Sequence, residues 1–342
     1  MEKLRTPLQV RVRQASTARL RLHRTRIRRI LRWYAVFSRA LHRMVLSVGD
    51  HDCLNVAQST AYSAIVALFP ALIVAAAVIG LLPDTAPVRF QLADFFDRVL
   101  PPSVSALLDA TFENAPKHTH SLRALIGAGV VSFAGASNVI STLMEGLRRA
   151  YRLPDDCWSF WQRRIRSIEL VPLSLVPLTI ASLLVVFGHA LTGWLVSSIG
   201  PQVREPIYVA TLLLRWGIAL GSSVVLIALL YHLGVPDMSR RELDGEATRM
   251  KLATPPKNWR WTILPGALLA TALWFPATLI FGWYVTRFTN YSEVYGPLGT
   301  GIALLFWLYI ISLSVLCGAE FNVHFNAQIE AHFGGDQRNR RR

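Results

Sequence analysis

The sequence predicts an all-α integral membrane protein with six transmembrane helices and two short amphipathic helices in its first external loop. Six long stretches contain no Asp, Glu, Lys or Arg, and each reaches the roughly 20 apolar residues that span a bilayer core. None alternates as a barrel strand does, and backbone groups in lipid must bond within the protein, so each stretch is expected to be a helix. The stretches are residues 53–83, 124–144, 170–203, 216–236, 261–286 and 294–319.

The distribution of Lys and Arg predicts which ends of these spans face the cytoplasm. Cytoplasmic loops retain positive charge during membrane insertion. Segment 1–43 holds 13 of these residues, segments 148–166 and 234–260 hold 6 each, and the tail after residue 323 holds 4. Of the intervening segments, 84–121 holds 3 Lys and Arg residues, and 204–206 and 287–293 hold 1 each. Both termini are therefore predicted to be cytoplasmic.

The net charge of +15 is concentrated in a basic arm, residues 1–43, which carries +12. Leucines and isoleucines are interspersed among seven arginines over residues 19–33, as in a basic helix that lies on anionic lipid headgroups. An RNA-binding arm and a mitochondrial presequence are the alternatives. The predicted domains are this arm, a six-helix transmembrane domain over 44–327 and a basic tail over 328–342.

Small residues at four-residue intervals predict close packing of the first, second and fourth spans. Such stripes let helix backbones approach in lipid, which gives no hydrophobic drive for association. They comprise Ser59, Ser63, Ala67, Ala71 and Ala75, then Ala124, Ala128, Ser132 and Ala136, then Gly217 and Gly221. Prolines inside the first, third and fifth spans predict kinks at Pro70, Pro172, Pro177, Pro265 and Pro276.

The first external loop, residues 84–121, is expected to hold the two amphipathic helices. Apolar residues follow helical spacing over 92–100, Pro101 and Pro102 break the run, and the spacing resumes over 104–112. These helices either float in the outer headgroup layer or close over the outer mouth of the bundle.

Polar residues at membrane depth are candidates for a substrate pathway. Arg215 lies several residues inside the fourth span, where a buried arginine costs roughly 2.5 to 3.5 kcal/mol. It is expected to contact an anion or a lipid headgroup, or to snorkel to the outer surface. Asn138 in the second span is more typical of a hydrogen bond between helices than of a ligand contact.

Three glutamates lie near the predicted cytoplasmic ends of spans, at the depth of several arginines. They form either a structural ring of salt bridges or a site that couples transport to a proton or cation, and spacing alone does not separate these interpretations. The glutamates are Glu145, Glu169 and Glu320, and the arginines are Arg148, Arg149 and Arg166.

No catalytic, cofactor-binding or metal site is predicted. His118 and His120 begin a His-x-His element, but no Asp-His follows them, and the chain has no Gly-rich phosphate loop. The three cysteines are not paired at metal-ligand spacing and are expected to stay reduced on the cytoplasmic side. Enzymatic activity, and ribonuclease activity in particular, is therefore not expected.

Several short motifs resemble the YihY/BrkB family of bacterial inner-membrane proteins, over roughly residues 45–327. In order, they are Ala61-Tyr62, Leu68-Phe69-Pro70, Pro265-Gly266-Ala267, Tyr295-Gly296 and Gly318-Ala319-Glu320. Ala67 stands where the family usually has Ser. The resemblance implies six transmembrane helices in a bacterial inner membrane, with Glu320 as the foremost family-relevant residue and Tyr62 and Tyr295 behind it. Members carry ribonuclease and serum-resistance labels and suggestions of lipid transport.

The sequence thus favours a transporter or flippase-like protein for an amphipathic or anionic, lipid-like substrate. The alternative is a non-transporting membrane scaffold. Nucleic acid is not an expected partner, no cofactor is expected, and the oligomeric state stays open. The candidate residues for the substrate path or coupling are Arg215, Glu320, Glu145, Glu169, Asn138, Tyr62 and Tyr295.

Overall fold

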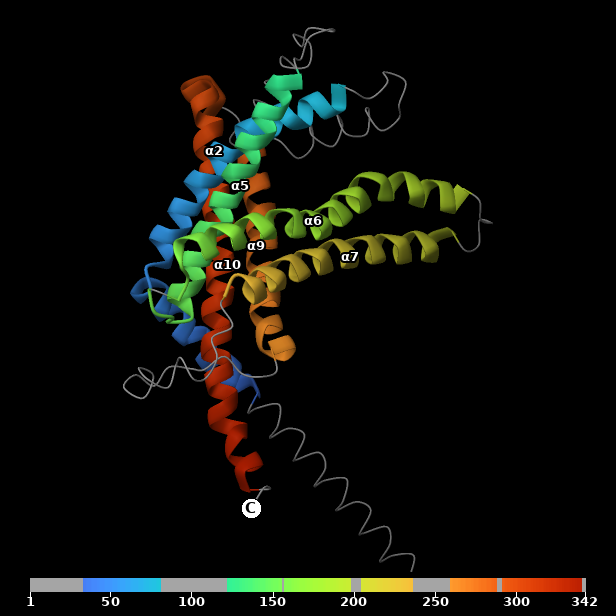
Figure 1. Ribbon diagram of the computed structural model, residues 1–342. Coiled ribbons are helices and arrows are strands. Elements are labelled where there is room, and N and C mark those ends of the chain that lie inside the picture. Colours follow the sequence, from blue (N-terminus) through green and yellow to red (C-terminus); the bar gives the residue numbers. More distant parts are fainter. Residues whose placement is uncertain are drawn as a thin grey trace, which may run out of the picture. The chain divides into compact units, whose positions relative to one another are not determined.

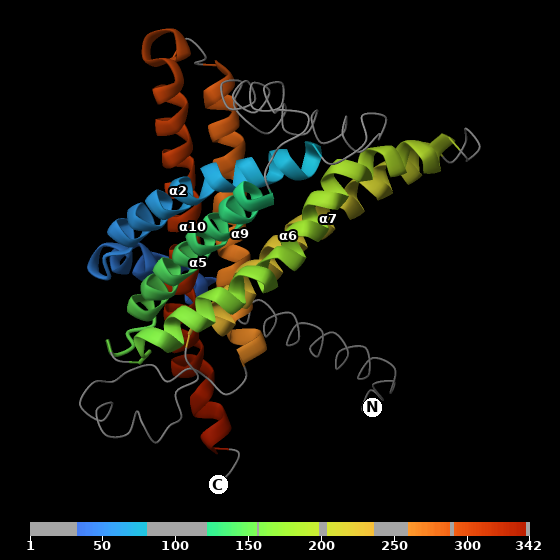
Figure 2. The same ribbon diagram turned by 45° about the horizontal axis from the view of Figure 1, so that its top comes forward.

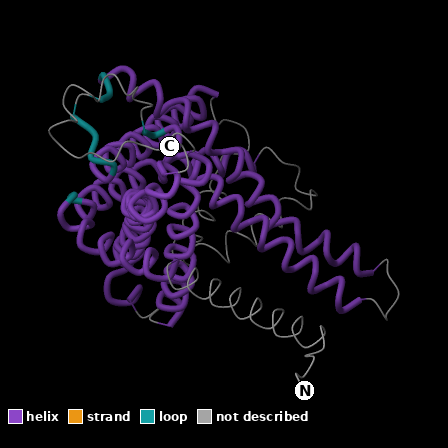
Figure 3. Tube along the Cα trace, turned by 90° about the horizontal axis from the view of Figure 1, so that it is seen from below, coloured by secondary structure: helices purple, strands orange, loops and turns teal. Residues whose placement is uncertain are grey.

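The computed structural model describes residues 33–80, 122–155, 157–197, 204–235, 259–287 and 291–339. All regular secondary structure within these ranges is helical (Figure 3). The chain divides into two units, one of residues 47–323 and one of residues 1–46 with 324–342. The predicted amphipathic loop helices and most of the basic arm lie outside the described residues.

The larger unit contains long helices at each predicted span. They are α2 (Cys53–Gly80), α5 (Leu122–Ala150), α6 (Phe160–Ser197), α7 (Arg204–Leu233), α9 (Trp259–Arg287) and α10 (Tyr291–Asn339), which continues into the smaller unit. Within the described residues, four helical segments are long and apolar enough to cross a membrane: Ile126–Ala150, Tyr208–Leu233, Thr262–Tyr284 and Gly301–Ile329. The all-helical fold is confirmed, and the count of six spans stays a prediction.

Consecutive helices pack side by side. Figures 1 and 2 show α2 against α5 and α6 against α7, while α5 also contacts α6 and α7 contacts α9. The kinking prolines lie inside α2, α6 and α9, and each helix continues through them.

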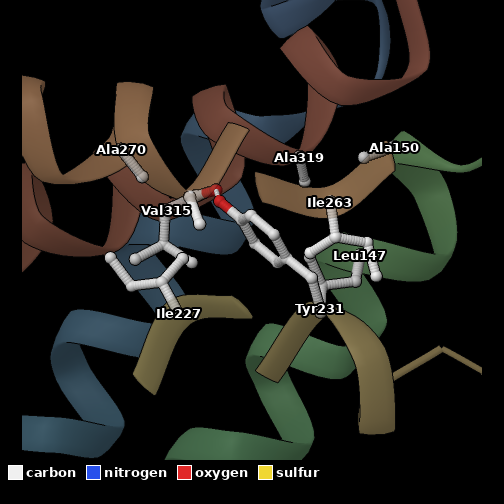
Figure 4. Packing of buried hydrophobic residues seen from close by; sticks show 9 residues of the cluster. Leu147, Ala150, Ile227, Tyr231, Ile263, Ala270, Val315 and Ala319 are labelled. Atoms are coloured by element: carbon white, nitrogen blue, oxygen red, sulfur yellow. Dashed lines mark hydrogen bonds between the residues drawn. The ribbon is translucent and has the colours of Figure 1, made fainter. Parts of the chain in front are cut away.

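The apolar core of the larger unit lies where alternate helix ends meet. It joins Leu147 near the end of α5, Tyr231 near the end of α7, Ile263 near the start of α9 and Ala319 of α10 (Figure 4). A second buried cluster places Cys53, at the start of α2, with Leu316 of α10. Helix starts therefore meet helix ends, as expected for neighbouring spans of opposite direction.

The small-residue prediction is confirmed for α2 and α5 and wrong for α7. A Cβ atom added at Gly135 would lie 2.6 Å from the Cβ of Ala67, so α5 touches α2 at the predicted stripe of α2, through a glycine beside the predicted stripe of α5. A Cβ added at Gly217 or Gly221 would meet no atom within 4 Å. α7 instead approaches α9 through larger groups, with the rings of Trp216 and Phe275 centred 6.0 Å apart.

In the smaller unit, helical residues before position 47 lie with the last part of α10. Val36, Ala40 and Met44 recur every four residues and are buried. The rings of Trp33 and Phe325 are centred 6.2 Å apart. Within the described residues, helix therefore begins before the first predicted span, which starts at residue 53.

Candidate functional site

Glu320 is the central residue of the candidate site. Its side chain is fully buried in α10, and its Oε1 lies 2.5 Å from Nδ1 of His51. The Cys53 thiol donates a longer contact of 3.8 Å to the same oxygen. Burying a carboxylate is costly unless hydrogen bonds compensate for the lost water, so the imidazole is what lets Glu320 occupy this position.

A tight turn before α2 aims His51 at α10. Asp52 adopts a left-handed backbone conformation with φ of 61°, which aspartate tolerates better than most residues. The Asp52 carboxylate accepts a hydrogen bond from the side chain of Asn55 in the first turn of α2. It also forms an ion pair with Arg149 of α5, with 2.9 Å between the charged atoms. The turn is therefore fixed both to α2 and to α5.

His51 connects the buried carboxylate to the surface of the larger unit. The His51 side chain keeps 19% of its surface exposed, whereas Glu320 keeps none. Arg152, in the turn after α5, interacts electrostatically with Glu320. Burial raises the pKa of the neighbouring Tyr151 to about 12, so this phenol stays neutral near the carboxylate.

Glu145 forms a separate ion-pair cluster at the end of α5. Arg148 donates to both its oxygens, at 2.7 and 3.1 Å, and Arg149 donates at 3.1 Å. Arg163 of α6 reaches it at 3.3 Å. The cluster ties α5 to α6, and because Arg149 also bonds Asp52, it ties both helices to the His51 turn.

Glu169 has a different environment from the other two glutamates. It is 57% exposed and pairs with Arg166 of its own helix at 3.1 Å. An exposed ion pair of this kind contributes at most about 1 kcal/mol. The structure thus separates the three glutamates into a surface pair, an arginine cluster and the buried pair with His51.

Asn322 bonds the backbone of α9 on either side of Pro265, and nothing in the sequence analysis singled it out. It accepts a hydrogen bond from the Gly266 backbone N–H at 2.7 Å and donates to the Ile263 carbonyl at 3.1 Å. Pro265 lies between these groups and disturbs the regular helical bonds. A polar residue two positions after Glu320 was the available signal, because intramembrane prolines require a partner for freed backbone groups.

Close helix contact surrounds this bond. A Cβ added at Gly266 would collide with the Gly318 carbonyl oxygen, and a Cβ added at Gly318 would collide with that of Gly266. The Tyr231 hydroxyl donates to the Val315 carbonyl at 2.5 Å, as Figure 4 shows. α7, α9 and α10 are therefore fixed together one turn from Glu320.

The structure shows no contact between Glu320 and the remaining candidate residues among those it describes. Arg215 is half-buried in α7, and the 16 residues that separate it from Tyr231 correspond to roughly 24 Å of helix. The Asn138 side chain donates to Ser63 at 3.1 Å, between α5 and α2. Tyr62 is 66% exposed, and the Tyr295 side chain lies outside the described residues. No three His, Cys, Asp or Glu side chains of the described part are placed to hold a metal ion.

Comparison with known proteins assigns the chain to a family. The family described as virulence factor BrkB matches residues 44–342. The chain belongs to this family. Among the relatives of this BrkB-family chain, the putative ribonuclease-like protein YfkH of Bacillus subtilis is 24% identical over 80% of this chain and 90% of its own length.

Two further relatives carry the description UPF0761 membrane protein. That of Tolumonas auensis is 29% identical over 79% of this chain and 80% of its own length. That of Alkalilimnicola ehrlichii is 26% identical over 79% of this chain. The chain spans 54% of the latter's length, and similar relatives are also longer than the matched region. No solved structure matches the chain.

These relationships show that the chain is a membrane protein. In the fold, two of the BrkB-family motifs lie close together. Gly266 and Gly318 are the contact points between α9 and α10. Glu320 follows Gly318 by half a turn and faces His51. Two motifs that are far apart in the sequence therefore build one site.

Proposed function

We propose that this BrkB-family protein is a transporter or flippase-like protein for an amphipathic or anionic, lipid-like substrate. It acts in the inner membrane of a bacterium, with six transmembrane helices and cytoplasmic termini. The basic arm lies on anionic lipid headgroups. The observation that carries the proposal is the buried Glu320 carboxylate bonded to the partly exposed His51.

The pair has the properties of a coupling site. A carboxylate inside a membrane protein is expensive and is typical of proton and ion pathways. Proton transfer between His51 and Glu320 converts an ion pair into a neutral pair. Such a conversion changes how strongly α10 is bound to the turn before α2, because a charged hydrogen bond is stronger than a neutral one.

The proton route and the substrate route are separate in this proposal. His51 exchanges protons with the cytoplasm, since its side chain reaches the surface of the larger unit. Arg215 lies toward the opposite end of α7 and attracts an anionic headgroup there. Movement of α7, α9 and α10 together, relative to the turn before α2, links the two events.

Reconstituted vesicles test the proposal. A fluorescent phosphatidylglycerol is followed between leaflets under an imposed pH gradient. Glu320→Gln preserves shape but not charge, so it should reduce gradient-dependent movement at least ten-fold while the melting temperature stays close to that of the parent. Glu169→Gln, which removes an exposed carboxylate, is the matched control and should behave as the parent.

Arg215→Ala should likewise abolish movement without unfolding the protein. Full movement in both the Glu320 and Arg215 variants would contradict the transport proposal. Failure of either variant to fold would assign that residue to the structure of the bundle instead.

A non-transporting scaffold is the second candidate. The Glu145 cluster and the Asn322 bonds favour it, because both fix helices to one another. If the protein is a scaffold, it moves no lipid in vesicles. Loss of the ion pairs of Glu145 should then lower the stability of the helix bundle.

We also propose that the protein is not an enzyme. YfkH is named ribonuclease-like, but hydrolysis of a phosphodiester needs metal ligands or an acid and base pair that reaches the substrate. The His-x-His element of this chain, His118 and His120, is incomplete and lies outside the described residues, and His51 is bonded to the fully buried Glu320. Metal-dependent RNA cleavage that co-purifies with the protein and is lost in a variant of either histidine would contradict this.

A further inference from the structure

A groove between α5 and the start of α6 is lined almost entirely by apolar groups. Its volume is about 380 Å³, and it is open to the surroundings of the bundle; lining residues include Ile126, Gly129, Val130 and Phe133 of α5 and Arg164 and Ile168 of α6. The Ser137 and Ser167 hydroxyls lie 3.0 Å apart and join the two helices at one end of it.

One cation lies at the joined end of this groove. Arg164 precedes Ser167 by one helical turn and lines the groove beside Ser137. It differs from its neighbours: Arg163 and Arg166 both bond carboxylates, whereas no ion pair of Arg164 occurs among the described residues. Arg164 as a whole is half-buried.

The dimensions and the charge identify the occupant. The groove wall from Ile126 to Ser137 corresponds to roughly 16 Å of helix, about half of the roughly 30 Å hydrocarbon core. An acyl chain of one leaflet has this length. An arginine matches a phosphate with paired hydrogen bonds. The segment 148–166 carries six basic residues and two acidic ones, which disfavours a headgroup with a quaternary ammonium.

We propose that this groove binds one anionic glycerophospholipid, with an acyl chain along α5 and its phosphate on Arg164. The lipid covers exposed apolar side chains, among them Val130 at 63% and Phe133 at 41%. The proposal concerns a bound lipid and stands independently of transport, because a lipid that stays in the groove stabilises the contact of α5 with α6.

Native mass spectrometry of the full-length protein in detergent tests this binding. Phosphatidylglycerol and phosphatidylcholine with identical acyl chains are titrated separately. The parent should bind phosphatidylglycerol about ten-fold more tightly. Both headgroups offer a phosphate to Arg164, but only phosphatidylcholine carries a quaternary ammonium, which the positive charge of Arg164 repels. Arg164→Ala should lose this preference and Arg164→Lys should retain most of it. Arg166→Ala, which removes the same charge two residues away outside the groove, should keep it.

Two glycines provide a matched test of the apolar wall. A Cβ atom added at Gly129 or at Gly127 would meet nothing within 4 Å, so a side chain fits at both positions. Only Gly129 lines the groove. Gly129→Leu should therefore weaken the binding of both lipids at least five-fold, while Gly127→Leu should bind as the parent.

The proposal is wrong if the parent binds both lipids equally, or if Arg164→Ala retains the preference. It is also wrong if Gly129→Leu binds lipid as well as Gly127→Leu does. Size-exclusion profiles identify any variant that does not fold, and Arg164→Gln then replaces Arg164→Ala.

Discussion

Glu320 and Asn322 lie two residues apart on α10 and have opposite roles. Glu320 holds an ionisable group in a buried place, with His51 as its direct link to the surface of the larger unit. Asn322 is also fully buried, but it carries no charge and bonds backbone groups of α9. The first residue can respond to a proton, whereas the second fixes the helix on which the response depends.

Asn322→Ala should lower the stability of the protein. It leaves the buried Gly266 N–H and Ile263 carbonyl without these partners, and an unsatisfied buried group costs about 1 to 3 kcal/mol. A loss of about 2 kcal/mol in the free energy of unfolding in mixed micelles is expected. Asn138→Ala removes one hydrogen bond on the exposed side of α5 and should cost less than about 0.6 kcal/mol. Equal losses would show that Asn322 is not a special partner of the kinked helix.

At the scale of the elements, α9 and α10 approach each other closely beside the site. Their contact depends on the absence of side chains at Gly266 and Gly318, since each backbone occupies the space that the other residue's Cβ would need. Pro265 has no N–H for the helix of α9 at this point, and Asn322 bonds the neighbouring backbone groups. The proline, the asparagine bonds and the close contact therefore lie together at one place on α9.

Gly318→Ala should separate α9 from α10. The added Cβ would collide with the Gly266 carbonyl and the Tyr231 hydroxyl, and overpacking of a core typically costs about 1 to 3 kcal/mol. A fall in melting temperature is expected, with a faster reaction of the buried Cys53 thiol as α10 moves. Gly217→Ala, in open space on α7, should leave both measurements unchanged or raise stability slightly. A Gly318 variant as stable as the parent would mean that the two helices separate without cost.

At the scale of the molecule, buried residues gather where alternate helix ends meet, and much of the remaining helix surface is apolar and exposed. Leu213 and Leu214 of α7 are 67% and 63% exposed, and Ile280 of α9 is 64% exposed. In water such surfaces would aggregate, whereas in a bilayer they face lipid. This distribution agrees with the membrane location that the family relationship establishes.

Cysteine labelling tests the proposed topology. In a protein that lacks Cys53, Cys157 and Cys317, single cysteines at positions 109 and 293 should react with an impermeant maleimide in intact cells. A cysteine at position 155 should react only after permeabilisation, because the Lys and Arg counts place that loop inside. Labelling of position 109 only in permeabilised cells would reverse the proposed orientation.

The sequence by itself determined the helical membrane class and the alternating direction of the helices. Both depend on local properties: a long run without charge makes a helix in lipid wherever it lies. The family motifs likewise pointed to Glu320 and Gly266 before their surroundings were known. Pro265 marked a kink without showing what would satisfy the backbone.

Only the tertiary structure decided which polar groups meet. His51 and Glu320 are 269 positions apart, and Asn322 bonds Gly266 from 56 positions away. Such pairings depend on the rotation of each helix about its axis and on its neighbours, which a charge-free run does not encode. For the same reason, Gly217 and Gly221 have the pattern of a packing stripe and face open space. Arg164 was one basic loop residue among six until the fold placed it at the end of an apolar groove.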